Sequence, residues 1–131
     1  MSPTPVIAIV DDDEPVRTAT AALVRSLGYE ARAFASAEAF LGCPGAGACD
    51  CLIVDVQMPG MSGPDLQQAL LQRPGATPII FITAFPDAQL REQVLAAGAI
   101  GMLGKPCDGE ALVTSIKAAL EQRQGAAATH L

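Results

Sequence analysis

Apolar and polar residues follow one another along the chain in blocks, with five short strand-like runs each followed by a segment of helical spacing. The first run, over 6–10, is unbroken, apolar and rich in β-branched residues, which is typical of a parallel strand buried on both faces, whereas residues 29–34 alternate enough to form a short strand. We expect strands over residues 6–10, 29–34, 51–55, 78–83 and 100–103. Five strand and helix pairs in alternation predict an α/β domain with a parallel sheet, helices on both faces and right-handed crossovers.

The segments after the runs begin with residues that favour the first turn of a helix. Pro15 suits a first turn, and Ser36 and Asp108 are good N-cap residues. The expected helices cover 15–27, 37–41, 65–72, 87–97 and a final segment after residue 108. We expect one domain over residues 1–124, followed by a disordered tail of small and polar residues over 125–131.

Composition and charge argue against several kinds of protein. Of the 131 residues, 50% are hydrophobic and 17% are charged, which is typical of a packed globule. A net charge of −6 without a Lys/Arg cluster argues against direct nucleic-acid binding. No apolar run reaches membrane-spanning length, and residues 1–5 do not resemble a signal peptide. We therefore expect a soluble, cytoplasmic protein that does not bind membranes.

The four cysteines follow no metal-binding or disulfide pattern. Cys43, Cys49, Cys51 and Cys107 are irregularly spaced and form no C-x-x-C pair. Disulfides are also rare in cytoplasmic domains of this size. We expect the cysteines to be small buried hydrophobic residues.

Polar side chains stand where four of the five runs end. Asp11 and Asp12 follow the first run, Asp55 and Thr83 end the third and fourth, and Lys105 lies just past the fifth. Because the carboxyl ends of parallel strands meet at one edge of a sheet, we expect these residues to lie together. Three close carboxylates raise one another's pKa unless a cation lies between them. Oxygen ligands that leave room for water and a phosphate suit Mg²⁺.

This arrangement makes Asp55 the expected nucleophile. Lys105 would offer a point charge and Thr83 a hydroxyl to a phosphoryl group, and aspartyl phosphates are recognised covalent intermediates. Taken singly, the residues have plainer interpretations, which are a solvated acidic turn, an Asx-turn acid, a strand threonine and a surface lysine. Together they favour a phosphoryl-acceptor site.

The run of three aspartates leaves two registers for the acid pair. The apolar run ends at Val10, which places Asp11 and Asp12 nearest the sheet edge. Asp13 or Glu14 then stands at the N-terminus of the next helix, where a carboxylate is favourable. We therefore expect Asp11 and Asp12 to belong to the site.

The ordered motifs resemble a response-regulator receiver domain of two-component signalling, with the closest resemblance to receivers of nitrogen-fixation-type transcription regulators. The matching pieces are Val10-Asp11-Asp12, Asp55 before Met58-Pro59-Gly60-Met61-Ser62-Gly63, Thr83-Ala84 and Lys105-Pro106. The resemblance implies that residues 1–124 form a receiver domain. It also implies a flavodoxin-like, doubly wound five-stranded parallel sheet of strand order 2-1-3-4-5, with helices on both faces.

The resemblance implies a role for each site residue. Asp55 would accept phosphate from a histidine kinase or a histidine phosphotransfer protein. Asp12 would bind Mg²⁺ directly, Asp11 mainly through water, and Gln57 through its backbone carbonyl. Lys105 would bridge to the phosphoryl group, with the peptide bond to the following proline in the cis form. Such a domain catalyses only its own phosphorylation and dephosphorylation.

Three positions bear on switching and on the lifetime of the phosphorylated state. Thr83 would pair with an aromatic residue on the last strand in the family, and Met102 stands there instead. This places the usual switch in doubt, although methionine is flexible enough to fill the same space. Gln57 and Phe85 occupy the two positions that tune hydrolysis, and a phenyl ring cannot orient water. We therefore predict that the phosphorylated state lives longer than in receivers that carry polar side chains at both positions.

Two other functions remain open at this point. A degenerate receiver would act only as a docking module, which Met102 favours and the complete acid, threonine and lysine set disfavours. A Mg²⁺-dependent phosphatase of the haloacid dehalogenase type also uses an aspartate nucleophile. That family needs an acid two residues later, and Gln57 stands there instead.

The resemblance also frames the output of the chain. In the nitrogen-fixation-type regulators a DNA-binding segment follows the last helix, and residues 1–131 contain none. If the chain is complete, we expect output through protein contacts or by passing phosphate onward in a relay. If it is one domain of a longer regulator, we expect the whole protein to bind DNA. A homodimer would form through helix 87–97, strand 100–103 and the final helix. Small residues on this face, Ala88, Gly101 and Ala118, would permit close approach and equally suit a plain surface. Arg91, Lys117 and Arg123 are interpreted as solvated helix charges.

Overall fold

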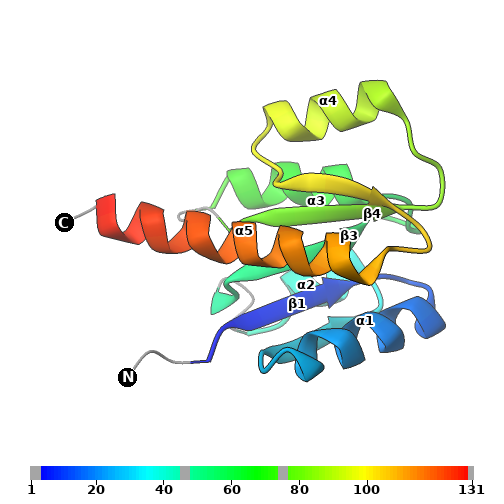
Figure 1. Ribbon diagram of the computed structural model, residues 1–131. Helices are drawn as coiled ribbons and strands as arrows, with labels where there is room; N and C mark the ends of the chain where they lie inside the picture. The colour runs from blue at the N-terminus through cyan, green and yellow to red at the C-terminus, as the bar shows by residue number, and fades with distance from the viewer. Residues whose placement is uncertain (1–3, 45–47, 74–76, 130–131) are drawn as a thin grey trace.

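The computed structural model describes residues 4–44, 48–73 and 77–129, and only the backbone of 124–129. Five parallel strands form one sheet of order β2-β1-β3-β4-β5 (Figure 1). The strands are β1 Val6–Val10, β2 Glu30–Phe34, β3 Cys51–Asp55, β4 Ile79–Thr83 and β5 Gly101–Gly104. The predicted fold class and strand order are confirmed.

Five helices cover the two faces of the sheet. They are α1 Glu14–Ser26, α2 Ala37–Leu41, α3 Gly63–Leu71, α4 Ala88–Ala96 and α5 Gly109–Thr129. One core lies between the sheet and α1 and α5, where Val24 and Ile116 are fully buried. The other lies between the sheet and α2, α3 and α4, with Phe40 and Leu66 at its centre. Figure 1 shows α1 and α5 on the near side of the sheet.

Most helices begin at the capping residues that the sequence predicts. The Ser36 hydroxyl accepts a hydrogen bond from the Ala39 amide, 3.0 Å, at the start of α2. Helix α3 begins two residues earlier than expected, because Ser62 and Asp65 form a capping box that extends the first turn back to Gly63. The apolar pattern therefore predicted that a helix is present here, but the capping residues determine where it begins.

The last helix runs further than the sequence predicted. The backbone of 125–129 is helical, where we expected a disordered tail, and residues 130–131 lie outside the described residues. Residues 126–128 are all alanine, the strongest helix former, and this propensity explains the difference. The domain limit at residue 124 stays a prediction.

Three further features bear on the predictions. The peptide bond between Lys105 and Pro106 is cis, as the resemblance implied. Cys49 and Cys51 are buried as expected, whereas Cys43 and Cys107 are only half-buried. Within the described parts of the chain, no helix combines the length and apolar character that crossing a membrane requires.

Candidate functional site

The strands bring the predicted polar residues to one edge of the sheet. Asp55 is the last residue of β3 and pairs with Ile82, so Thr83 lies one step further along β4. Asp11 directly follows β1, and Lys105 directly follows β5. The Lys105 amide donates to the Thr83 carbonyl, 2.7 Å, which joins the ends of β4 and β5. These four residues therefore lie together, where the topology predicted them.

Lys105 forms ion pairs with two of the acids. Its Nζ lies 3.0 Å from Oδ2 of Asp11 and 3.2 Å from Oδ2 of Asp55. The Asp11 side chain has no exposed surface, and those of Asp55 and Lys105 are 6% and 14% exposed. Charges so shielded from water interact strongly. Lys105 thus links the two carboxylates at the centre of the site.

This environment alters the proton affinity of both partners. Burial and the charge of Asp11 raise the pKa of Asp55 to about 6, and the hydrogen bond and charge of Lys105 limit that rise. Burial opposes the positive charge of Lys105, but its bonds with the two acids outweigh burial and raise the pKa of the ammonium group. The site therefore holds more negative charge than one lysine compensates.

A third acid completes a group that fits a divalent cation. One carboxylate oxygen from each of Asp11, Asp12 and Asp55 lies within 4.8 Å of the others. Lys105 Nζ donates to Oδ1 of Asp11 at 3.3 Å, so buried Oδ2 is left with the ion pair and no hydrogen bond. An oxygen in this position is available to a cation. The all-oxygen donor set suits Mg²⁺.

The two neighbouring aspartates are held very differently. Asp11 is fixed, because its Oδ1 accepts from the Asp13 amide at 2.9 Å and its carbonyl accepts from Arg17 Nη1 at 2.8 Å. Asp12 is exposed and makes no hydrogen bond or ion pair with another described residue, which leaves its carboxylate available as a ligand. Asp13 caps α1 by accepting from the Val16 amide at 3.3 Å. The placement agrees with the expected register.

Sequence reasoning missed the contact of Arg17. This half-buried guanidinium binds the main chain of the loop that carries the acid pair, one helical turn past the cap of α1. A single basic residue on a helix carries no signal that would distinguish this contact from a solvated charge. Only the structure shows that the Asp11 carbonyl lies within reach of the Arg17 side chain.

Thr83 is buried, but in this structure its hydroxyl is engaged within its own loop. Oγ1 accepts a hydrogen bond from the Phe85 amide, 3.0 Å. The Phe85 side chain itself is 68% exposed. Gln57 is also exposed, and its amide donates to Oδ1 of Asp55 at 3.3 Å. The roles of Gln57 and Phe85 in hydrolysis stay predictions.

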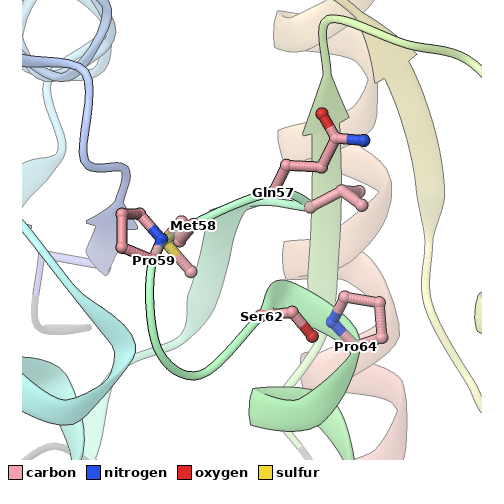
Figure 2. Close-up of a pocket in the computed structure, with 6 residues that line it drawn as sticks. Gln57, Met58, Pro59, Ser62 and Pro64 are labelled. Carbon is pink, nitrogen blue, oxygen red and sulfur yellow. The ribbon is translucent and has the colours of Figure 1, made fainter.

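A shallow pocket of about 520 Å³ lies on the loop that follows Asp55. Figure 2 shows the Gln57 side chain pointing away from that of Pro59, with Ser62 and Pro64 at the start of α3. The pocket is lined by Val56, Gln57, Met58, Pro59, Ser62 and Pro64. None of the three acids lines it, but Gln57, the expected carbonyl ligand, does, so the pocket adjoins the candidate cation site.

Met102 is buried in the core between the sheet and α4, pairing with Phe81 across the ladder. Its carbonyl accepts a hydrogen bond from Arg91 Nη1, 3.2 Å. Arg91 is exposed, in keeping with its interpretation as a solvated charge, and it makes this additional bond because the fold brings α4 alongside β5. The partly exposed Arg123 also has a contact that the sequence did not predict, since its Nε lies 3.6 Å from Oδ1 of Asp50. Whether Met102 takes part in switching stays a prediction.

With the site described, comparison with known proteins decides the family. The sequence profile of the response regulator receiver domain matches residues 7–117. The chain belongs to the response regulator receiver domain family. Domains of this family are signalling modules of two-component systems and generally bind Mg²⁺ at an acidic pocket. Neither the docking-only nor the phosphatase alternative is favoured by this match.

Individual relatives agree with the family assignment. The chain is 46% identical over 116 residues to the response regulator protein TmoT of Ectopseudomonas mendocina, covering 88% of this chain and 53% of TmoT. It is 31% identical over 121 residues to the transcriptional regulatory protein FixJ of Bradyrhizobium diazoefficiens, covering 92% of this chain and 59% of FixJ. The solved structure of the response regulator StyR superposes with a TM-score of 0.87 at 37% identity, covering 98% of this chain and 66% of StyR. The chain thus spans little more than half the length of these curated relatives.

Proposed function

We propose that this receiver domain is a phosphorylation-dependent switch in which Asp55 accepts a phosphoryl group from a histidine kinase or a histidine phosphotransfer protein. The carrying observation is the position of Lys105 Nζ, 3.0 Å from Asp11 and 3.2 Å from Asp55 at the carboxyl edge of the sheet. This places one fixed cation between a candidate nucleophile and a candidate metal ligand. Such preorganised charge stabilises developing negative charge during transfer.

The acid group is the proposed Mg²⁺ site. Asp12 and Asp55 would bind the ion directly, Asp11 mainly through water, and Gln57 through its backbone carbonyl. A bound Mg²⁺ would neutralise negative charge on the phosphoryl group during the transfer. Oδ2 of Asp11, which is ion-paired with Lys105 but accepts no hydrogen bond, and the exposed carboxylate of Asp12 support this assignment.

The chain's own residues would carry out the transfer in one displacement. An oxygen of Asp55 forms a bond to phosphorus as the bond from phosphorus to the donor imidazole nitrogen breaks, and the electron pair stays on that nitrogen. Lys105 would bind one phosphoryl oxygen, and Thr83 would donate its hydroxyl hydrogen to another. Hydrolysis would replace the bond to Asp55 by a bond to water. The domain would therefore catalyse only its own phosphorylation and dephosphorylation.

Phosphorylation would be read out through protein contacts. The relatives that the chain matches extend well beyond the region they share with it, and FixJ is named a transcriptional regulatory protein. The face made by α4, β5 and α5 is our candidate for the output contact, with a second copy of the chain as the partner. Neither a membrane nor nucleic acid would bind this domain directly.

Intact mass measurement tests the proposed acceptor. The protein is incubated with Mg²⁺ and acetyl phosphate, with and without chelator, beside the variant Asp55→Asn. We expect one phosphoryl adduct on the parent, no adduct on the variant and none in chelator. An unlabelled parent, under conditions that label a control receiver, would favour the docking-only function, and repeated turnover of phosphomonoesters would favour the phosphatase.

A further inference from the structure

The loop between β3 and α3 is held by a side chain from a different helix. Oε2 of Glu38, on α2, accepts a hydrogen bond from the amide of Met61 at 3.2 Å. The two residues lie 23 positions apart in the sequence. This loop carries Gln57, the residue proposed to offer a backbone carbonyl to Mg²⁺. The contact therefore connects α2 to a loop that would hold a metal ligand.

The main chain at Gly60 is shaped to receive this carboxylate. Gly60 has a φ of +77°, a conformation that side chains rarely adopt. A Cβ built at this position would lie 2.5 Å from Oε2 of Glu38. Only glycine gives the carboxylate this approach to the loop, so the contact depends on the local backbone as well as on the acid.

Two other hydrogen bonds of the loop are local, and the Val56 amide at its start donates to the Ile82 carbonyl of β4 at 2.9 Å. The Ser62 amide donates to Asp65 Oδ2 at 3.3 Å within the capping box of α3, and the Gly63 amide donates to the Val56 carbonyl at 3.0 Å. Both bonds fix the end of the loop that enters α3. Glu38 acts at the turn before it, between the capping box and Gln57.

Helix α2, which carries Glu38, is held against the core. Ala37 and Phe40 are three positions apart on one face of the helix and are buried, and Ser36 caps the first turn. The Phe40 ring also packs edge to face on Phe34, with ring centroids 5.3 Å apart. A carboxylate on such a helix can fix the position of a loop that it contacts.

We infer that Glu38 is a positioning residue for the proposed Mg²⁺ site. By holding the Met61 amide, Glu38 would restrict the loop that carries Gln57 and so help to position the Gln57 carbonyl for the ion. Glu38 itself touches neither the ion nor the phosphoryl group. The inference rests on the proposed function, and it predicts a change in Mg²⁺ affinity rather than a loss of the site. Partners that orient metal ligands commonly have this effect.

Three substitutions at Glu38 separate reach, charge and packing. Glu38→Gln keeps an oxygen acceptor at the same reach and removes the charge. Glu38→Asp keeps the charge and shortens the reach by one methylene, and Glu38→Ala removes both. Glu92→Ala is the matched control, because Glu92 is an exposed acid on α4 whose side chain has no hydrogen bond or ion pair with any described residue.

The measurement is the Mg²⁺ dissociation constant of the unphosphorylated full chain, taken from the backbone amide NMR shifts of Gln57 and Met58 during titration with MgCl₂. We expect Glu38→Ala and Glu38→Asp to weaken binding by about threefold to tenfold. Glu38→Gln and Glu92→Ala should stay within about twofold of the parent, the effect expected of a lost exposed charge. Thermal melts accompany each variant, because a purely structural role would lower stability without this pattern.

Several results would overturn the inference. If Glu38→Gln binds Mg²⁺ as weakly as Glu38→Ala while Glu38→Asp binds it like the parent, the charge of Glu38 attracts the ion and its hydrogen bond to the loop does not matter. The inference is also contradicted if all variants bind Mg²⁺ equally, or if all three Glu38 variants bind it equally weakly, because neither result depends on whether the side chain can reach the Met61 amide. A parent that binds Mg²⁺ and accepts phosphate while its Ala variant is unchanged overturns this inference alone. A parent that binds no Mg²⁺ overturns the proposed function with it.

Discussion

At the scale of single residues, the site combines a fixed acid, a free acid and an acid of raised proton affinity. Asp11 is held through its main chain and side chain, Asp12 is exposed, and Asp55 is buried with Lys105 between it and Asp11. Burial makes the ionised form of Asp55 unfavourable in the metal-free fold. The acid group therefore favours cation binding at the expense of the free energy of unfolding, and unfolding at a series of pH values can measure this cost.

The sign of this effect follows from the pKa of Asp55. The fold raises that pKa from 3.8 to about 6, with burial as the largest cause, so the folded state binds the proton more tightly than the unfolded state. Stability from this group is therefore full below about pH 4 and is lost as pH rises to about 6. Above that range the ionised Asp55 lowers the free energy of unfolding.

Asp55→Asn should therefore stabilise the metal-free protein. We expect its free energy of unfolding in chelator at about pH 7.5 to exceed that of the parent by about 1–3 kcal/mol. The difference should shrink between about pH 6 and pH 4. Urea unfolding at several pH values measures both quantities, with Glu92→Gln as the exposed control. A variant less stable than the parent at the higher pH would contradict the prediction.

At the scale of elements, α4 is attached to the domain by a small apolar contact and two polar ones. Val94 is its one buried residue among those described in the helix. Gln67 Nε2 on α3 donates to the Val94 carbonyl at 3.1 Å, and Arg91 donates to the Met102 carbonyl on β5 at 3.2 Å. These two bonds hold α4 from both sides, so its position depends on side-chain hydrogen bonds more than that of α1 or α5.

Gln67→Met tests the bond between α3 and α4. Methionine keeps the length and packing of this buried side chain and removes the donor, while the Val94 carbonyl keeps its bond from the Ala99 amide at 2.9 Å. We expect a loss of about 1 kcal/mol in the free energy of unfolding. Amide hydrogen exchange should speed up over 88–96 and stay unchanged in α1. Unchanged exchange in α4 would show that apolar packing alone holds the helix.

The same elements show how far sequence can lead. Periodicity and caps placed the strands and most helix starts, because Ser36 and Asp13 act through bonds to residues three positions away. The edge of the sheet was predictable because each polar residue follows an apolar run. Glu38, Gln67 and Arg91 carry no such signal, since their partners lie in other elements. From the sequence alone, these residue types are equally compatible with solvated helix surfaces. Only the fold shows which residues they contact.

At the scale of the whole molecule, a phosphoryl group at the edge of the sheet would have to alter the surface formed by α4, β5 and α5. Thr83 and the buried Met102 stand on adjacent strands, and Arg91 connects Met102 to α4. A change at Thr83 would therefore reach α4 through β5 without an aromatic residue. The face formed by α4, β5 and α5 is where such a change would become accessible to a partner.

We expect activation to favour a dimer through this face. Ala88 and Ala118 are exposed and Gly101 is half-buried, so two copies can approach closely there. Sedimentation velocity with Mg²⁺ and beryllofluoride, which imitates the phosphoryl group, should shift the protein from monomer to dimer, and Asp55→Asn should not shift.

Ala118→Arg places a bulky charge on the face, far along α5 from Lys105, and should block the dimer while acetyl phosphate still labels Asp55. Thr18→Arg on α1, at an exposed position outside the α4, β5 and α5 face, serves as the control for added charge and should leave the dimer intact. If beryllofluoride leaves the parent monomeric, the small residues form a plain surface and the output partner is a different protein. If the Ala118 variant still dimerises, the contact lies on another face.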